Sequence, residues 1–388
     1  MPYLYCEVQR MDFKYFDNAA TTRVDQEILK IISLYNTVGY YNPSANYLPA
    51  VEIHNQVSEA RESILRLLKG FGGTLYFLSS GTEGDNQALV CSKKRKNSNI
   101  VISAAEHPAV YQTANYLKNC GYEVRICPVL SDGRVKTDEF SSLIDENTSL
   151  VSVMHVNNET GGINDIRALV SLAKGKNPGL LFHSDGVQAF GKIPVNLADL
   201  GVDLYTISGH KIGAPKGIAG LFVKKGVTLS PLLYGGGQEG GLRSSTENVA
   251  GIMAFAHAAN RAIGELPTLS EKYRSFAEII KNRLSVIEEL RFLSDSDCSP
   301  HILTFAFCTV RGEVMQHALE SKGYLVGTGS ACSSTRSHER IPKALELKEY
   351  ADGILRVSFG RETTSEDVLG LAEEIVKNYE ILKKYVGK

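Results

Sequence analysis

Lys211 lies in a segment whose residue types suit covalent chemistry with an aldehyde. It follows Ser208 and His210 in the glycine-rich segment 208–217, directly after an apolar run that predicts a strand. A lysine that forms a Schiff base needs a rigid backbone anchor and an amine that stays open to the reacting group. A solvated loop lysine is the alternative, and the segment alone leaves both open.

A carboxylate and an amide stand after the preceding predicted strand. Asp185 directly follows that apolar run, and Gln188 stands three residues later. Open α/β sheets bind ligands at the carboxyl ends of their strands. Asp185 could keep the nitrogen of a bound pyridine ring protonated, and Gln188 could donate to a ring oxygen. The alternative for Asp185 is to cap the next helix.

The turn at 79–83 joins a predicted strand to a predicted helix and suits a phosphate group. Gly81 lets the backbone approach closely, Thr82 adds a hydroxyl, and the helix N-terminus supplies N–H donors. Such turns are common, so this one is weak evidence by itself. The chain has no G-x-x-x-x-G-K-[ST] run, which excludes a Walker-type loop.

Cys332 is the candidate nucleophile among seven cysteines. Residues 327–335 around it are small and polar, which indicates an exposed loop where a thiol can ionise. The other six stand mostly in mixed or apolar contexts, and we interpret them as small buried hydrophobes. Their scattered positions and the lack of a C-x-x-C pair argue against a disulfide framework and a zinc site. We therefore expect a reduced, cytoplasmic setting and no metal.

Arg356 and His107 complete the set of candidates. The planar guanidinium of Arg356 could hold a carboxylate through two parallel hydrogen bonds, although Arg361 competes for this role. A surface ion pair is the alternative for Arg356. His107 could cap the face of a ring or move protons near neutral pH, and a purely structural role is its alternative.

Taken in order, these segments resemble the fold-type I pyridoxal-phosphate enzymes and, more closely, the cysteine desulfurases of the NifS/IscS type. The resemblance runs from residues 16–22 to the terminal helix. The further segments that carry it are 42–44, 106–110, 154–159, 235–246, 329–332 and 355–361.

The resemblance implies a cofactor, pyridoxal 5'-phosphate, and a homodimer. The implied cofactor-binding residues are Gly81, Thr82, His107, Asn158, Asp185, Gln188, Ser208, His210, Lys211 and, reaching the phosphate of the neighbouring subunit, Thr246. Asn158 and Arg356 are implied to bind the substrate, and Lys211, His107 and Cys332 to be catalytic.

The implied reaction converts free L-cysteine to L-alanine and leaves the sulfur on Cys332 as a persulfide. An acceptor protein then takes the sulfur: an iron–sulfur scaffold, a tRNA-thiolation enzyme or another carrier. The rivals are a selenocysteine lyase or an aminotransferase of the same fold, and a catalytically silent scaffold. Cys332 argues against an aminotransferase, which needs no thiol. The intact set of site residues argues against a scaffold.

Three positions depart from the family pattern. Tyr47 stands in a run where the family often has histidine and glycine, Gly84 begins a Gly-Asp pair in place of Ser-Asn, and Gly240 replaces a common arginine. These departures bear on the subfamily and on the sulfur acceptor. The loop around Cys332 resembles that of the longer-loop desulfurases.

The elements that position these residues alternate between short apolar runs and longer mixed segments, which predicts a mainly parallel, seven-stranded sheet covered by helices. The expected strands are 74–78, 100–103, 123–128, 150–155, 180–184, 204–208 and 219–223, with helices at 82–93 and 164–174 among the connections. We expect a large α/β domain at 15–259 that binds the cofactor. Residues 1–14 and 260–388 would form a smaller α+β domain.

The C-terminal helix is expected to begin with a capping box. Thr363 and Glu366 have the required spacing and precede an apolar stripe.

Composition limits the classes of partner. Lys and Arg total 42 against 43 Asp and Glu, so the net charge of −1 gives no reason to expect nucleic acid. No stretch is apolar for long enough to span a membrane, and the N-terminus lacks the pattern of a secretory signal. We expect a soluble protein with no membrane partner.

Overall fold

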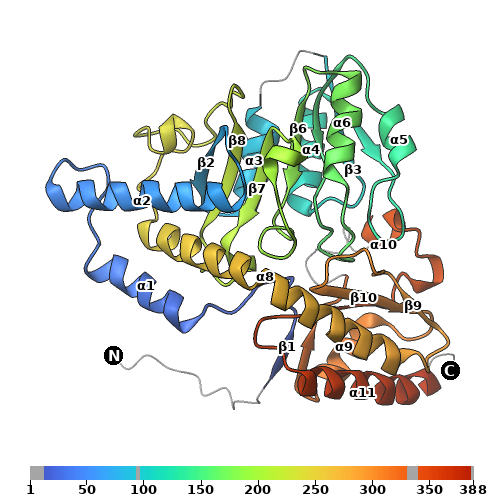
Figure 1. The fold of residues 1–388 in the computed structure, drawn as a ribbon. Coiled ribbons are helices and arrows are strands. Elements are labelled where there is room, and N and C mark those ends of the chain that lie inside the picture. The colour runs from blue at the N-terminus through green and yellow to red at the C-terminus, as the bar shows by residue number, and fades with distance from the viewer. Residues whose placement is uncertain (1–12, 93–96, 330–339, 386–388) are drawn as a thin grey trace.

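The computed structural model describes residues 13–92, 97–329 and 340–385 (Figure 1). Its largest sheet has seven strands in the order β2-β8-β7-β6-β5-β3-β4. Parallel pairs join β4 to β3, β3 to β5, β5 to β6 and β6 to β7, whereas β8 runs antiparallel to both β7 and β2. These strands are β2 (Gly73–Leu78), β3 (Asn99–Ser103), β4 (Glu123–Cys127), β5 (Thr148–Ser152), β6 (Leu181–Asp185), β7 (Leu204–Ser208) and β8 (Ala219–Lys224).

The prediction of a mainly parallel seven-stranded sheet is confirmed, and each expected run forms one of its strands. The strands read as apolar runs because both faces of the sheet are covered. Ile100 and Ile102 of β3 pack in the hydrophobic cluster that contains α3 (Gly81–Cys91) and α4 (Pro108–Asn119). Val101 between them belongs to the cluster on the opposite face, with α6 (Ile166–Lys176).

A second, smaller body lies below this sheet in Figure 1. It contains the antiparallel sheet β12-β10-β9 and the parallel pair of β1 with β11. Its core is a separate cluster that includes Phe16, Phe305 and Phe359. Its strands and helices are β1 (Lys14–Phe16), β9 (Leu290–Phe292), β10 (Ile302–Phe307), β11 (Tyr324–Val326), β12 (Ile354–Ser358), α9 (Gly312–Glu320) and α11 (Ser365–Leu382).

Helix α8 (Val249–Leu284) packs on both bodies: its first part contacts α1 (Gln26–Thr37) and α2 (Leu48–Leu67), and its last part contacts α11. The domain boundary expected between 259 and 260 falls inside this helix, and the division into domains stays a prediction. The remaining elements are short: α5 (Thr137–Ser142), α7 (Leu197–Leu200), α10 (Arg340–Ala344) and the 3-10 helices η1 (Gly209–Lys211), η2 (Glu239–Gly241), η3 (Lys348–Tyr350) and η4 (Lys383–Tyr385).

The capping box of α11 lies one residue later than predicted. Thr364 is the N-cap, and it exchanges hydrogen bonds with Asp367. The prediction at Thr363 and Glu366 is wrong because the Thr363 hydroxyl already accepts a bond from the backbone N–H of Gly360. The turn that leaves β12 therefore uses the first threonine, and the helix uses the second.

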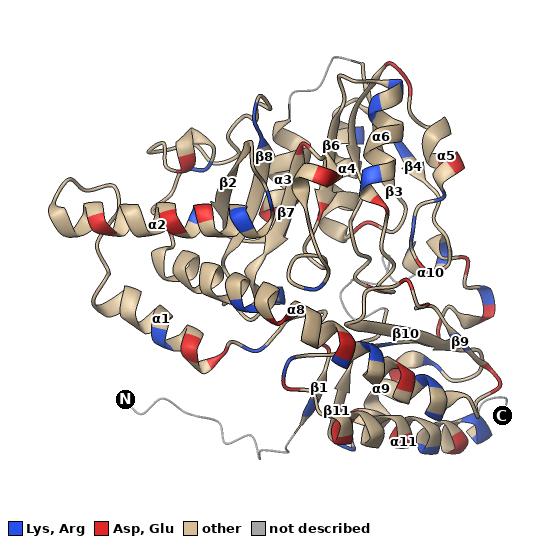
Figure 2. Ribbon diagram, viewed as in Figure 1, with Lys and Arg blue, Asp and Glu red and all other residues tan. Residues whose placement is uncertain are grey.

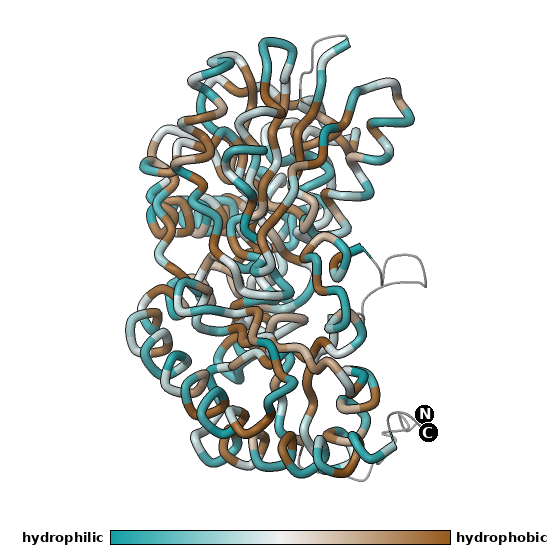
Figure 3. The backbone as a smooth tube through the Cα atoms, turned by 90° about the vertical axis from the view of Figure 1, so that its right-hand side faces the viewer, coloured by the Kyte–Doolittle hydropathy of each residue, from teal (hydrophilic) through white to brown (hydrophobic). Residues whose placement is uncertain are grey.

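Charge and hydropathy are distributed as in an ordinary globular fold. Figure 2 shows acidic and basic residues interspersed along α8 and α11. Figure 3 shows hydrophobic segments in the interior and hydrophilic ones on the outer turns. Within the described part of the chain, no helix has the length and apolar character needed to cross a membrane.

Candidate active site

A cavity of about 320 Å³ opens at the carboxyl ends of the parallel strands. This is the edge where sheets of this type bind ligands. The small body contributes Thr328, Gly329 and Arg356 to its wall. The predicted site residues that line it are Gly81, Thr82, His107, Asn158, Asp185, Gln188, Ser208, His210, Lys211 and Arg356.

Lys211 ends the short helix η1, three residues beyond the buried strand β7. Its ammonium donates to the backbone oxygens of Ala19 and Ala20, at 2.7 and 2.8 Å. The chain after β1 is held there because Thr22 donates twice to the His210 carbonyl. The amine therefore lies in the cavity, and its two acceptors there are neutral backbone oxygens. Breaking these two hydrogen bonds does not break an ion pair.

Asp185 is the last residue of β6 and is buried at the base of the cavity. Its carboxylate accepts from the Val187 N–H at 2.9 Å. Burial raises its pKa to about 6, although this bond and the charge of Lys211 act in the opposite direction. A cation placed beside Asp185 would therefore relieve an unfavourable burial. Asp185 thus caps the turn that follows β6 and also faces the cavity. Its two interpretations from the sequence, a cap and a ligand-binding carboxylate, do not exclude each other.

Asp85 and His107 lie close to this carboxylate. One oxygen or nitrogen from each of Asp85, His107 and Asp185 falls within 4.8 Å of the others, a grouping that could hold a metal ion. The same atoms could instead surround the nitrogen side of an aromatic ring. The expectation of no metal stays a prediction.

His107 precedes α4 and caps it, since its Nδ1 accepts from the Ala109 N–H at 3.1 Å. Burial, together with the charges of Lys211 and Arg340, lowers its pKa to about 4. The imidazole is therefore neutral near pH 7, and because its Nδ1 accepts from Ala109, its Nε2 carries the hydrogen and can donate. Its structural and chemical roles do not exclude each other.

Gln188 is oriented by His301, a residue that the sequence analysis did not select. The Gln188 amide donates to the Ala19 carbonyl at 2.8 Å, and its oxygen lies 3.2 Å from Nε2 of His301. Ser299 meets the other ring nitrogen of His301 at 2.7 Å. Burial keeps the pKa of His301 well below its usual value, so the ring is neutral. Gln188 retains a second amide hydrogen for a ligand.

The start of α3 offers the donors that a phosphate needs. Gly81 and Thr82 are its first residues, and N–H groups in a first helical turn lack acceptors within the helix. Ser208, at the end of β7, also lines the cavity. Its buried hydroxyl has no hydrogen-bond partner in the described part of the chain. An orphaned hydroxyl and an aligned helix end fit the phosphate of pyridoxal 5'-phosphate, as Asp185 fits its ring nitrogen.

Arg356 comes from β12 and is buried between three acceptors. It donates to Asp17 at 2.8 Å and to the backbone oxygen of Asn158 at 2.8 Å, and a Glu159 oxygen lies at 3.4 Å. The competing Arg361 lines a different cavity, where it pairs with Asp25. The sequence analysis missed Asp17 and Glu159 as partners, although both lie in segments that carry the family resemblance.

Two predicted site residues, Cys332 and Thr246, need separate mention. Cys332 lies outside the described residues, in the stretch between Gly329 and Arg340, which both line the cavity. Thr246 is described but does not line it, and its side chain is exposed. Its predicted contact across a dimer stays a prediction.

The other described cysteines only partly follow the expectation of burial. Cys91, Cys127 and Cys298 are buried, whereas Cys120 is exposed and Cys308 is half-buried. Cys120 is exposed because it ends α4, beyond the buried stripe of that helix. Burial raises the pKa of Cys127 and of Cys298 to about 12, so neither thiol ionises near neutral pH. Cys6 lies outside the described residues.

The departure at Gly84 has a packing reason. A Cβ atom built there would lie 2.7 Å from the Thr206 side chain of β7, so glycine allows α3 to sit close to the sheet. Tyr47 is the exposed N-cap residue of α2, and Gly240 adopts a positive φ of 60° within η2. None of the three lines the cavity.

Comparison with known proteins shows the family of the chain. Residues 14–371 match the model of the aminotransferase class-V family, to which the chain belongs. It is 35% identical to the cysteine desulfurase IscS of Clostridium botulinum over 94% of this chain and 93% of that protein. Within the class-V proteins, the chain therefore belongs to the cysteine desulfurases.

Solved structures show the same relationship. A NifS-like protein has a TM-score of 0.88 and 32% identity, covering 95% of this chain and all of that one (100%). A structure described as SspA in complex with cysteine has a TM-score of 0.76 and 25% identity, covering 89% of this chain and 98% of that one. The fold-type I architecture expected from the sequence is confirmed.

We predict that Arg356→Lys raises the KM for L-cysteine about tenfold or more, with a smaller change in kcat. Lysine keeps the positive charge beside Asp17 and Glu159 but cannot offer the planar fork that a carboxylate fits. Steady-state kinetics over a range of cysteine concentrations measure the effect. Arg361→Lys is the matched control and should leave KM within about twofold. Equal effects of the two substitutions would contradict the assignment.

Proposed function

We propose that this protein is a pyridoxal-phosphate-dependent cysteine desulfurase that converts free L-cysteine to L-alanine and keeps the sulfur as an enzyme persulfide. The observation that carries the proposal is the convergence of Lys211, Asp185, Gln188, His107 and Arg356 on one cavity. Family membership supports the same reaction.

The residues that line the cavity suit the phosphate and the ring of the cofactor. Gly81, Thr82 and Ser208 would hold its phosphate, and Asp185 would keep its ring nitrogen protonated while Gln188 donates to its ring oxygen. When bound, pyridoxal phosphate stabilises negative charge at the α-carbon of an amino acid.

Different residues of the chain bind the substrate and transfer its protons. Arg356 holds the carboxylate of cysteine, with Asn158 beside it, and so orients the α-carbon toward Lys211. The Lys211 amine moves the α-proton. His107 assists proton transfer around the substrate thiol as a neutral hydrogen-bond donor, because its Nδ1 accepts from the Ala109 N–H and its Nε2 therefore carries the hydrogen.

Cys332 completes the reaction as nucleophile. Its thiolate attacks the sulfur of the substrate, the carbon–sulfur bond breaks, and protons return to the carbon skeleton as alanine leaves. One thiol and one cysteine thus yield one persulfide and one alanine, without an external oxidant. Support comes from the small, polar sequence around Cys332 and from the cavity-lining residues on both sides of that stretch, Gly329 and Arg340.

The sulfur acceptor and the homodimer are also part of this proposal. The persulfide sulfur passes to an acceptor protein, such as an iron–sulfur scaffold. The active unit is a homodimer in which Thr246 reaches the partner's cofactor phosphate, supported by its exposed side chain. The division at 15–259 against 1–14 and 260–388, and the cytoplasmic location, stay predictions.

We predict that Cys332→Ser stops persulfide formation but leaves cofactor binding unchanged. A serine hydroxyl does not ionise near neutral pH and attacks sulfur poorly. Peptide mass spectrometry after incubation with cysteine should find one added sulfur on the wild-type Cys332 peptide and none on the variant. Cys308→Ser is the control and should behave as wild type. A persulfide on Cys308 or Cys298, or undiminished turnover in the Cys332 variant, would refute this mechanism.

We predict that Thr246→Ala weakens pyridoxal-phosphate binding about tenfold, because one hydrogen bond to a charged phosphate is lost. Spectrophotometric titration of cofactor-free protein measures the affinity, and sedimentation measures the oligomeric state. The neighbouring exposed Ser245→Ala is the control. A fully active monomer, or unchanged cofactor affinity in the Thr246 variant, would be incompatible with a site shared across the dimer.

A further inference from the structure

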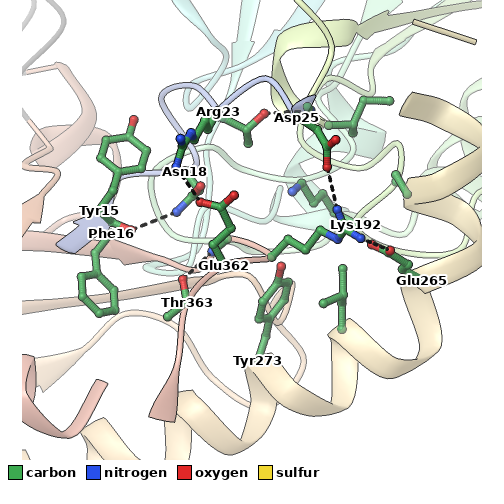
Figure 4. A pocket seen from close by; sticks show the side chains of 18 of the residues that line it. Tyr15, Phe16, Asn18, Arg23, Asp25, Lys192, Glu265, Tyr273, Glu362 and Thr363 are labelled. Atoms are coloured by element: carbon green, nitrogen blue, oxygen red, sulfur yellow. Dashed lines mark hydrogen bonds and ion pairs between the residues drawn. The ribbon is translucent and has the colours of Figure 1, made fainter. Parts of the chain in front are cut away.

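A second cavity, of about 450 Å³, lies beside the chain that leads from β1 into α1. Its walls come from that segment, from α8, from the turn after β12 and from Lys192 of the large body (Figure 4). The two cavities border some of the same chain segments, but none of the predicted site residues lines the second cavity. Its size is that of a site for a small organic molecule.

Nearly all charges in this lining are paired with one another. Each of its four carboxylates lies between 2.5 and 3.3 Å from a guanidinium or ammonium group of the same lining. The pairs are Arg261 with Asp25, Arg361 with Asp25 and Glu265, Arg23 with Glu362, and Lys14 with Asp367.

Lys192 is the cation left over. It is half-buried, and its ammonium makes no hydrogen bond or ion pair within the described part of the chain. Five cations against four carboxylates leave one uncompensated positive charge in the cavity. Burial, then the charge of Lys211, lowers the pKa of Lys192 to about 8, so it is still mostly protonated at pH 7. A partly desolvated ammonium without a counter-ion is unfavourable, and a bound anion would remove this cost.

Another part of the lining is mostly apolar. Phe16 and Tyr273 are buried, and Phe13 and Leu269 belong to the same lining. Figure 4 shows Phe16 and Tyr273 below the charged groups and Lys192 among those groups. A ligand that satisfies both parts of the lining carries one negative charge at one end and an apolar body at the other.

We propose that this cavity binds a small organic monocarboxylate, with its carboxylate on Lys192 and its apolar part against Phe16, Leu269 and Tyr273. A single charge suits the single uncompensated cation, whereas a phosphate dianion would bring a surplus negative charge next to Asp25 and Glu265. The site does not depend on the proposed function, because it shares no catalytic or cofactor-binding residue with it.

Calorimetric titration of the cofactor-loaded protein with sodium benzoate tests this site, with benzyl alcohol as the uncharged probe of the same shape. We expect benzoate to bind more tightly than benzyl alcohol. Lys192→Met should weaken benzoate binding about tenfold or more, whereas Lys192→Arg should retain it. The exposed Lys225→Met should bind as wild type and controls for a general change of charge. Benzoate binding should also persist in Arg356→Lys, which separates this cavity from the active one.

Leu269→Trp keeps the charge of Lys192 but fills the apolar end of the cavity, and it should also lose benzoate binding. It provides the test if Lys192→Met does not fold, as judged by its melting transition. Benzoate binding at wild-type affinity in Lys192→Met or in Leu269→Trp would overturn the proposal. Equal affinity for benzoate and benzyl alcohol, or no binding of benzoate to the wild type, would also overturn it.

Discussion

The buried guanidinium of Arg356 is the contact on which the geometry of the active cavity depends. It joins β12 of the small body to Asp17, which follows β1, and to the chain at Asn158 of the large body. A buried charge is stable only when its hydrogen-bonding groups are satisfied, so these three segments are constrained together. Because Asp17 is fixed, Ala19 is placed where its carbonyl accepts from Lys211 and from Gln188.

Burial sets the charge state of most groups around the cavity. It lowers the pKa of His107 and of His301, and it raises the pKa of Glu106 to about 8 and of Asp185 to about 6. Near pH 7 His107, His301 and Glu106 are therefore mostly neutral, whereas Asp185 stays largely ionised. A ligand that brings a ring cation and a phosphate would find a carboxylate for the first and helix N–H donors for the second. This complementarity is the physical basis of the functional assignment.

The sequence predicted the large sheet well because strands buried on both faces read as uninterrupted apolar runs. It predicted Asp185 because this residue closes such a run and the carboxyl ends of parallel strands converge, whereas Ser208 was implied by the family resemblance. The support of Gln188 by His301 was not predictable, since 113 positions separate the two residues and no local pattern links them. For the same reason the surplus positive charge at Lys192 was not predictable, because the other charged residues of its cavity come from three segments that are distant in the sequence. At α11 a capping box is present, as predicted, but it lies one residue later, because the Thr363 hydroxyl accepts a hydrogen bond within the preceding turn.

The central claim is that Lys211, and no other lysine, reacts with the aldehyde of pyridoxal phosphate. Borohydride reduction of the cofactor-loaded protein, followed by peptide mass spectrometry, tests it directly, since reduction fixes the cofactor to the lysine that holds it. Lys192 and Lys216 are the informative alternatives, because the charge of Lys211 acts on Lys192 and Lys216 lies in the same loop as Lys211. The account predicts a pyridoxyl group on Lys211. A label on Lys192 or Lys216 with Lys211 unmodified, or no label at all, would contradict it.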